Sequence, residues 1–202
     1  MVMDLDGDGL SEIVTAGCNL VYQNEGNGKY TKRDFLKSGI NRPAEAGLLA
    51  DLNGDGLIDY IGGDSEDGSL LLFLGSGKGK FIDEPYKFSL PPLKGLHAIS
   101  AGDIDGDRDL DLFIGQWKAP YIGGSMPTPY YNANDGYPDY LLRNEGDGTF
   151  VDITENAGLS GKSHRRTFSA SLVDIDFDQD LDLIVVADFS GLDLYLNDGT
   201  GK

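Results

Sequence analysis

The sequence is poor in several residue types, and each scarcity excludes a class of protein or site. Cys18 is the only cysteine, which excludes an intrachain disulfide. There are two histidines, and 16 Lys and Arg stand against 34 Asp and Glu, for a net charge of −18. This balance offers no basic surface for nucleic acid or anionic lipid. No apolar run is long enough to span a membrane, and no signal peptide is expected before the acidic residues that begin at Asp4.

The acidic residues are concentrated in four nine-residue loops that share one pattern. Each loop has oxygen-bearing side chains at positions 1, 3, 5 and 9, and an apolar run follows. We call these segments the metal loops; they are 4–12, 51–59, 103–111 and 174–182. They hold 4, 3, 5 and 5 acidic residues, 17 of the 34, so the rest of the chain nearly balances its 16 basic residues. The acidity is therefore local to the loops.

This pattern predicts calcium binding. Alternating side chains of a tight loop point into one concavity, where two charges about 4 Å apart repel by roughly 4 kcal/mol at an effective dielectric near 20. Hard oxygen donors in a flexible cage suit calcium better than zinc or copper. The alternative is a set of solvated acidic turns, which the fourfold repetition disfavours. Four structural calcium ions would change the formal charge from −18 to −10.

The predicted ligands are the side chains at positions 1, 3, 5 and 9, the backbone carbonyl at position 7, and water. Two loops carry an additional carboxylate at position 7. The complete set of predicted metal residues is Asp4, Asp6, Asp8, Leu10, Glu12, Asp51, Asn53, Asp55, Leu57, Asp59, Asp103, Asp105, Asp107, Asp109, Asp111, Asp174, Asp176, Asp178, Asp180 and Asp182.

The segments between the loops predict an all-β fold of β-propeller blades. Each loop joins two short apolar runs, and a third run ends in a glycine-rich hairpin. In the first three repeats an aromatic residue then opens a fourth strand, at Tyr30, Phe81 and Phe150. Four antiparallel strands per ~50 residues is typical of a propeller blade. EF-hands are excluded because strands flank the loops, and Thr15 and Gly62 replace the required Glu at position 12.

The repeats predict a single propeller, or part of one, over 1–202. Their approximate limits are 1–43, 44–94, 95–166 and 167–202. The phase of the repeat indicates two complete blades and two partial ones, at the two ends of the chain. Closed propellers usually have more blades. We therefore expect a fragment of a larger propeller, for example a seven-bladed one; a smaller ring that another chain completes is the alternative.

An insertion at 116–139 interrupts the third repeat. It is rich in Gly and Pro and carries Trp117, Tyr121, Met126, Tyr130, Tyr131 and Tyr137. Exposed aromatic residues on such a loop would suit a protein or glycan ligand. Alternatively, the loop packs over the rim of the blade and buries its own aromatic residues.

Two segments carry a resemblance to a known family. They are 143–159 and 171–176, the latter leading to 193–199. Here the chain resembles the FG-GAP/VCBS repeat family, the calcium-loop propellers of integrin α-subunit heads, and most closely the branch of ASPIC/UnbV and cartilage acidic proteins. The resemblance implies structural calcium and a secreted or cell-surface location. It implies no single task, because the family includes adhesion heads, lectins and domains attached to enzymes.

The loops depart from this pattern at five residues, one of which is Glu12, which ends the first loop in place of aspartate. Position 6 is Arg108 and Gln179 in the last two loops instead of glycine, and Phe177 replaces glycine at position 4. A left-handed backbone at a non-glycine residue would cost about 1–2 kcal/mol. Asn53 leaves the second loop with three carboxylates. We therefore expect unequal affinities, with the second loop weakest by charge.

Three functions are compatible with these observations. The first is a calcium-stabilised extracellular module for binding or adhesion, and the second is a carbohydrate-binding propeller that stacks sugars on residues such as Trp117 and Tyr131. The third is an accessory or catalytic propeller of a polysaccharide-degrading enzyme. We expect no enzyme, because the metal loops account for most carboxylates. Outside them, only His97, His164 and the spare acids Asp64 and Asp188 attract attention.

Overall fold

The computed structural model describes residues 1–37, 40, 42–122 and 126–202. Residues 38, 39 and 41 of the first predicted repeat and 123–125 of the insertion lie outside the described residues. The chain divides into two compact units, Met1–Leu93 and Lys94–Lys202, and each is described by itself. That all four repeats belong to one propeller therefore stays a prediction.

The first unit contains two antiparallel four-stranded sheets. The first sheet follows chain order, and even its two-residue first strand pairs with the second. Its strands are β1 (Val2–Met3), β2 (Glu12–Thr15), β3 (Leu20–Asn24) and β4 (Tyr30–Asp34). The second sheet has the order β10–β7–β6–β5, and a small hairpin, β8–β9, stands beside it. These strands are β5 (Pro43–Ala50), β6 (Asp59–Asp64), β7 (Leu70–Phe73), β8 (Gly75–Gly77), β9 (Lys80–Phe81) and β10 (Tyr86–Lys87).

The second sheet differs from the sequence prediction at its fourth strand. We expected this strand to begin at Phe81, but Phe81 lies in the hairpin β8–β9, and β10 pairs with β7 instead. Pro85 accounts for the difference, because proline lacks the N–H that a continuing strand would donate. The Ile82 amide still bonds the Leu74 carbonyl at 2.8 Å, and the chain then leaves the hairpin.

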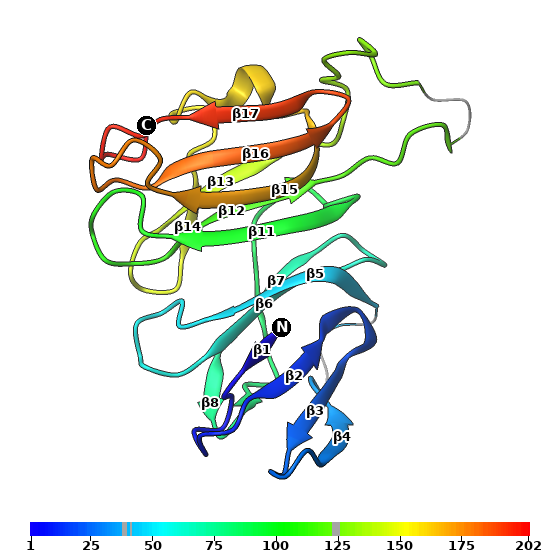
Figure 1. Ribbon diagram of the computed structural model, residues 1–202, viewed down its shortest axis with the longest axis vertical. Coiled ribbons are helices and arrows are strands. Elements are labelled where there is room, and N and C mark those ends of the chain that lie inside the picture. The colour runs from blue at the N-terminus through cyan, green and yellow to red at the C-terminus, as the bar shows by residue number, and fades with distance from the viewer. Residues whose placement is uncertain (38–39, 41, 123–125) are drawn as a thin grey trace. The chain divides into compact units, whose positions relative to one another are not determined.

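The second unit contains a four-stranded and a three-stranded antiparallel sheet, both in chain order (Figure 1). The third sheet comprises β11 (Leu96–Gly102), β12 (Asp111–Gln116), β13 (Tyr140–Asn144) and β14 (Phe150–Asp152). The fourth comprises β15 (Arg166–Val173), β16 (Asp182–Asp188) and β17 (Gly191–Tyr195). The Ser100 hydroxyl of β11 donates to the Ala170 carbonyl of β15 at 2.7 Å, which ties these two sheets together.

The prediction of an all-β fold of four-stranded blades is confirmed by these sheets. Every metal loop joins the first strand of a sheet to the second, as the sequence indicates. The partial first blade is the exception, because β1 completes a four-stranded sheet. Short 3-10 turns are the only helical elements in the described part of the chain, Ala16–Cys18 and Leu159–Lys162 among them. No helix among the described residues has the length and apolar character of a membrane span.

Each unit has its own apolar core between its two sheets. The core of the first unit is formed by Leu5, Val14, Ala16, Val21, Phe35, Leu36, Tyr60, Leu71 and Phe73. The core of the second is formed by Ile104, Phe113, Leu141, Ile153, Leu159, Leu183 and Val185. The two sets correspond by repeat position: Leu5 and Ile104 both occupy position 2 of a metal loop, beneath the cage. Burial of these residues anchors the loops from below.

Two buried arginines hold the insertion against the fourth sheet. Arg166 donates to both carboxylate oxygens of Asp135, at 3.0 and 2.9 Å, and to the Lys118 carbonyl at 2.8 Å. These hydrogen bonds are the main reason that the pKa of Asp135 falls to about 2. Arg165 donates to the Ala133 carbonyl at 2.9 Å. The described part of the insertion is therefore fixed by charged hydrogen bonds rather than by apolar packing alone.

Candidate metal centres

The backbone of all four metal loops turns in the same way. Positions 4 and 6 have positive φ in every loop. At position 4 the values are 77° for Gly7, 71° for Gly54, 78° for Gly106 and 65° for Phe177; at position 6 they are 89° for Gly9, 82° for Gly56, 81° for Arg108 and 83° for Gln179. The left-handed backbone that the sequence suggested at position 6 is therefore present in the two loops that lack glycine there.

The carboxylate at position 1 organises each turn. Asp4, Asp51, Asp103 and Asp174 each accept the backbone N–H of position 6. The four N···O distances are 2.9, 2.8, 3.0 and 3.1 Å in chain order. The acid at position 5 also accepts the amide of position 7, at 2.8 Å between Asp8 and Leu10. Local hydrogen bonds thus hold the carboxylates in place around one concavity.

The acid at position 9 has a second task. Glu12, Asp59, Asp111 and Asp182 are fully buried in their strands. In the third loop the two oxygens of Asp111 accept the amides of Ile104, at 2.9 Å, and Asn144, at 2.8 Å. The other three acids make the equivalent pair of bonds, to position 2 of the loop and to the residue that opens the next hairpin. Each therefore pins its loop to the end of the third strand.

Three loops bring acidic side chains together closely enough to share an ion. The groups are Asp4, Asp6 and Asp8; Asp103, Asp105 and Asp111; and Asp174, Asp176 and Asp178. In each group, one ligand atom per residue lies within 4.8 Å of the others. The second loop forms no such group among the described residues, because Asn53 stands at position 3 and donates its amide to Asp55 at 3.1 Å.

The electrostatics of the third and fourth loops match a cation site. Desolvation, followed by repulsion from a neighbouring loop carboxylate, raises the pKa of Asp105, Asp176 and Asp180. Desolvation also raises the pKa of buried Asp111 to about 6, although its two backbone hydrogen bonds act in the opposite direction. A cation among these groups would favour their charged forms. The candidate ligand atoms are all carboxylate oxygens, which fits calcium rather than a soft metal.

The sequence comparisons bear on these loops. Residues 51–114, from the second metal loop into β12, match the family described as FG-GAP-like repeat. Cartilage acidic protein 1 from Xenopus tropicalis is 29% identical over 177 residues, which cover 84% of this chain and 25% of that protein. The Mus musculus protein of the same name is 28% identical over 176 residues, with the same coverage.

The chain spans about a quarter of the length of the curated relatives it matches, since 25% of each is covered. Among solved structures, the V. cholerae biofilm matrix protein Bap1 aligns with a TM-score of 0.44 at 16% identity, over 94% of this chain and 28% of that chain. A likeness of this degree supports no argument. The resemblance to FG-GAP repeats and to the cartilage acidic protein branch is confirmed at modest identity.

The third and fourth metal loops carry a further acid at position 7. Asp109 and Asp180 were expected to be ligands, but neither belongs to the acidic groups above. Their carboxylates lie against the hairpin instead, 2.6 Å from where a Cβ on Gly146 or Gly199 would stand. Leu10 of the first loop shows the same direction, since it lies beside Gly26. Carbonyl ligation by Leu10 and Leu57 stays a prediction.

Sequence reasoning missed the residues that support the cages. Gln23 donates to both Asp6, at 2.7 Å, and Glu12, at 3.1 Å, and so links the cage to β3. Asn197 donates to the Ile104 carbonyl of the preceding loop at 2.7 Å. The available signal was the Asn-x-Gly sequence that opens three of the four hairpins, beginning at Asn24, Asn144 and Asn197.

The other singled-out residues lie away from the loops. Asp188 accepts the Trp117 indole N–H at 2.6 Å, and Asp64 accepts the Glu66 amide at 2.9 Å, so both acids have structural partners. His164 Nδ1 lies 3.2 Å from the hydroxyl of its neighbour Ser163. Among the described residues, no carboxylate hydrogen-bonds this histidine, so the pair lacks the third member of a triad.

Replacing Gln179 with glycine should stabilise the calcium-free protein by about 0.5–1 kcal/mol, because relief of the left-handed backbone exceeds the added entropy of the unfolded chain. Gln179 is exposed, at φ 83°. Urea unfolding in EDTA measures the effect. Gln179→Ala is the matched control, because alanine keeps the backbone strain and should change little. Equal stabilities for the two variants would contradict this explanation.

Proposed function

We propose that this chain is a calcium-stabilised repeat module for binding or adhesion outside the cell, with calcium in a structural role. The observation that carries the proposal is the set of three acidic groups at equivalent places in repeated loops. The match of the second and third loops to FG-GAP-like repeats supports it, and so does the similarity to cartilage acidic protein 1. Extracellular calcium suits modules whose dissociation constants are about 10⁻⁴–10⁻³ M.

In this proposal, calcium neutralises the carboxylates and holds the first two strands of each blade together. The side chains that would hold it are those at positions 1, 3 and 5 in the first and fourth loops, and those at positions 1, 3 and 9 in the third loop. The chain itself supplies the rest: backbone amides orient the position-1 acids, and the position-9 acids fix the loop to the third strand. We propose no catalytic role, since these contacts account for the loop carboxylates.

Calcium titration with a competing chromophoric chelator tests this function. We expect about three ions per chain from the three acidic groups, and a fourth, weaker one at the second loop. Asn53→Asp should strengthen that fourth site by roughly tenfold, because a charged ligand replaces an amide that now faces Asp55. Gln179→Asn is a control that leaves every acidic group unchanged. Fewer than one ion per chain, or equal affinity for magnesium, would reject the proposal.

A glycan-binding function is the second candidate, and the exposed aromatic residues of the insertion favour it. Tyr131 is 88% exposed, and Tyr130 packs edge-on against it with ring centroids 4.9 Å apart. The Tyr121 and Tyr130 hydroxyls lie 3.3 Å apart, and Phe189 supports both rings from the fourth sheet. These three tyrosines are exposed, as expected for a binding surface, whereas Trp117 is half-buried. A glycan array would distinguish a sugar ligand from a protein ligand.

A further inference from the structure

Half of the basic side chains of the first unit line one hollow. Residues 1–93 contain eight Lys and Arg against 15 Asp and Glu. The hollow has a volume of about 210 Å³ and is lined by β4, the segment after it and the hairpin β8–β9. Four basic and two acidic side chains belong to the lining: Arg33, Lys37, Lys78, Lys80, Asp34 and Asp83. A site of net positive charge on a chain of net charge −18 attracts anions.

The floor of this basic hollow is apolar. Phe35 and Phe73 are buried beneath it, and Phe81 is half-buried, with its ring centroid 5.1 Å from that of Phe35. Ile82 also lines the hollow and is 47% exposed. Apolar surface and positive charge therefore face the same small volume, and a ligand that fits it carries an apolar face next to a negative group.

Arg33 is held in a fixed position in the basic hollow. Its guanidinium donates to the Gly79 carbonyl at 3.1 Å and to the side-chain oxygen of Gln23 at 3.4 Å. A Cβ at Gly79 would stand 3.0 Å from the nearest guanidinium nitrogen, so glycine permits this close approach. Among the described residues, neither this guanidinium nor the three lysines of the hollow form an ion pair. A preorganised guanidinium without a carboxylate partner suits an oxyanion.

The hairpin β8–β9 differs in charge from the hairpins of the other three repeats. The second hairpin residue is acidic in the other three and is serine here: Glu25, Glu145 and Asp198 against Ser76. The fourth hairpin residue is basic here alone: Lys78 against Asn27, Asp147 and Thr200. The backbone is nevertheless the same, with φ 55° at Lys78 and 52° at Asn27. The positive charge of this hairpin is therefore not required by its shape.

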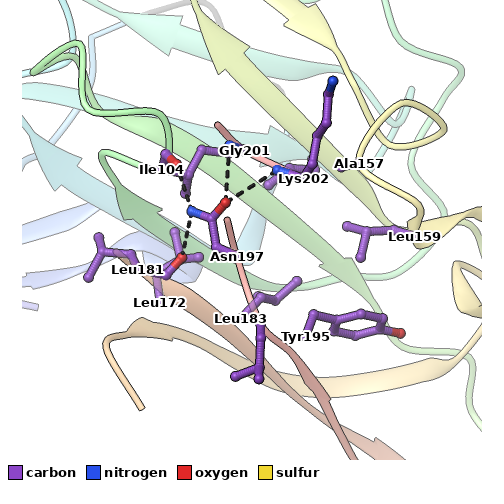
Figure 2. A pocket seen from close by; sticks show the side chains of 12 residues that line it. Ile104, Ala157, Leu159, Leu172, Leu181, Leu183, Tyr195, Asn197, Gly201 and Lys202 are labelled. Carbon is purple, nitrogen blue, oxygen red and sulfur yellow. Dashed lines mark hydrogen bonds between the residues drawn. The ribbon is translucent and has the colours of Figure 1, made fainter. Parts of the chain in front are cut away.

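The corresponding place in the second unit is apolar. Gly201 has the repeat position of Gly79, and the pocket beside it is lined largely by aliphatic side chains. Figure 2 shows Leu183 and Tyr195 among them. Lys202 is the one basic residue of that lining. The cluster of basic residues is therefore a property of the first unit and not of the repeat.

We propose that the basic hollow binds an acidic sugar, with its sulfate or carboxylate group between Arg33 and the hairpin lysines and a face of its ring on Phe81 and Ile82. A sugar of this kind carries the oxyanion and an apolar C–H face on one rigid ring, so both fit a small volume. An aspartate or glutamate side chain offers the floor little apolar area, and the net charge of −18 repels a long polyanion. The site uses neither the carboxylates of the metal loops nor the tyrosines of the insertion.

Titration of the full chain with single sugars, followed by amide chemical shifts in the presence of calcium, tests the site. The probes are a galactose sulfate and glucuronate, and the comparison ligands are galactose and inorganic sulfate. We expect saturable shifts at Arg33, Lys78 and Phe81 with either acidic sugar. Galactose and inorganic sulfate should each bind at least about tenfold more weakly, because one lacks the oxyanion and the other lacks the apolar face.

Lys78→Asn combined with Lys80→Thr tests the contribution of the hairpin. Both replacements occur at the same positions of other hairpins, as Asn27 and Thr149, so the melting temperature should be unchanged. Affinity for the acidic sugar should fall at least about tenfold, because two charges facing the oxyanion are removed.

Lys29→Thr combined with Lys87→Thr is the matched control, since it removes the same charge from the first unit outside the lining of the hollow. It should leave the affinity unchanged. An equal loss in both double variants, undiminished binding by Lys78→Asn with Lys80→Thr, or no shifts at millimolar acidic sugar would each overturn the proposal. Equal binding of inorganic sulfate would indicate an adventitious ion only, and tighter binding of a peptide with one sulfated tyrosine would assign the hollow to a protein ligand; both would overturn it too.

Discussion

Calcium at a hundred times its dissociation constant should raise the free energy of unfolding by about 2.7 kcal/mol for each occupied loop. With three acidic groups, the gain should reach roughly 8 kcal/mol, as long as the ions bind only the folded chain. Each unit has about 100 residues, so each kcal/mol should raise its melting temperature by about 4–8 °C. A rise of roughly 10–20 °C is expected for the first unit, with one acidic group, and of roughly 20–40 °C for the second, with two. Scanning calorimetry in EDTA and then in excess calcium measures it.

Calcium should raise the melting temperatures of the two units by unequal amounts. The second unit holds two acidic groups and the first unit holds one, so the transition of the second unit should shift further. Magnesium is the control ion, because it requires a near-ideal octahedron and dehydrates reluctantly. Asp174→Asn is the control variant, since it removes one carboxylate of the fourth loop and should reduce the shift of the second unit alone. A melting curve insensitive to calcium would leave the loops as solvated acidic turns.

Replacing Asp111 with alanine should lower the free energy of unfolding by about 3–5 kcal/mol even without calcium. The substitution leaves the amides of Ile104 and Asn144 buried without their acceptor, and each unsatisfied donor costs roughly 1–3 kcal/mol. Urea unfolding in EDTA isolates this contribution from that of the ion. The free energy of unfolding of Asp111→Asn should lie between those of the unchanged protein and Asp111→Ala, because the asparagine amide retains one oxygen for one of the two donors.

Asp109→Ala is the matched control for Asp111→Ala. Both change one aspartate of the same loop, but Asp109 lies against the hairpin at Gly146 and is not fully buried. A change of less than about 1 kcal/mol is expected, as for most substitutions outside the core. If the two alanine variants prove equally stable, the role of Asp111 as a pin between loop and hairpin is wrong.

The fold and the cages could be predicted from sequence because their determinants are local. The nine-residue pattern fixes the side chains that face the concavity, and the apolar runs on either side determine the strands it joins. Phe177 at φ 65° and Gln179 at φ 83° show that the loop geometry persists where glycine is missing. A short motif repeated four times carries enough information to specify such a turn.

What the sequence could not provide depends on contacts distant along the chain. Asp111 was predicted only as a ligand, because nothing near it shows that Asn144, 33 residues later, donates its amide to the same carboxylate. Asp109 and Asp180 were predicted only as ligands, and nothing near them in sequence shows that their carboxylates lie close to Gly146 and Gly199 of the hairpins. Phe81 was predicted to begin an outer strand, but it pairs within the hairpin β8–β9 and packs against the core of the first unit.

The hydrogen bonds of the position-1 and position-9 acids have a kinetic consequence. Because the chain itself holds these carboxylates, removal of calcium leaves the turns wound and the third strands tied. Reloading then requires only ion entry and partial dehydration, with no search through chain conformations. In the proposed calcium function, occupancy of such a loop should therefore follow the free calcium concentration as fast as the ion itself exchanges.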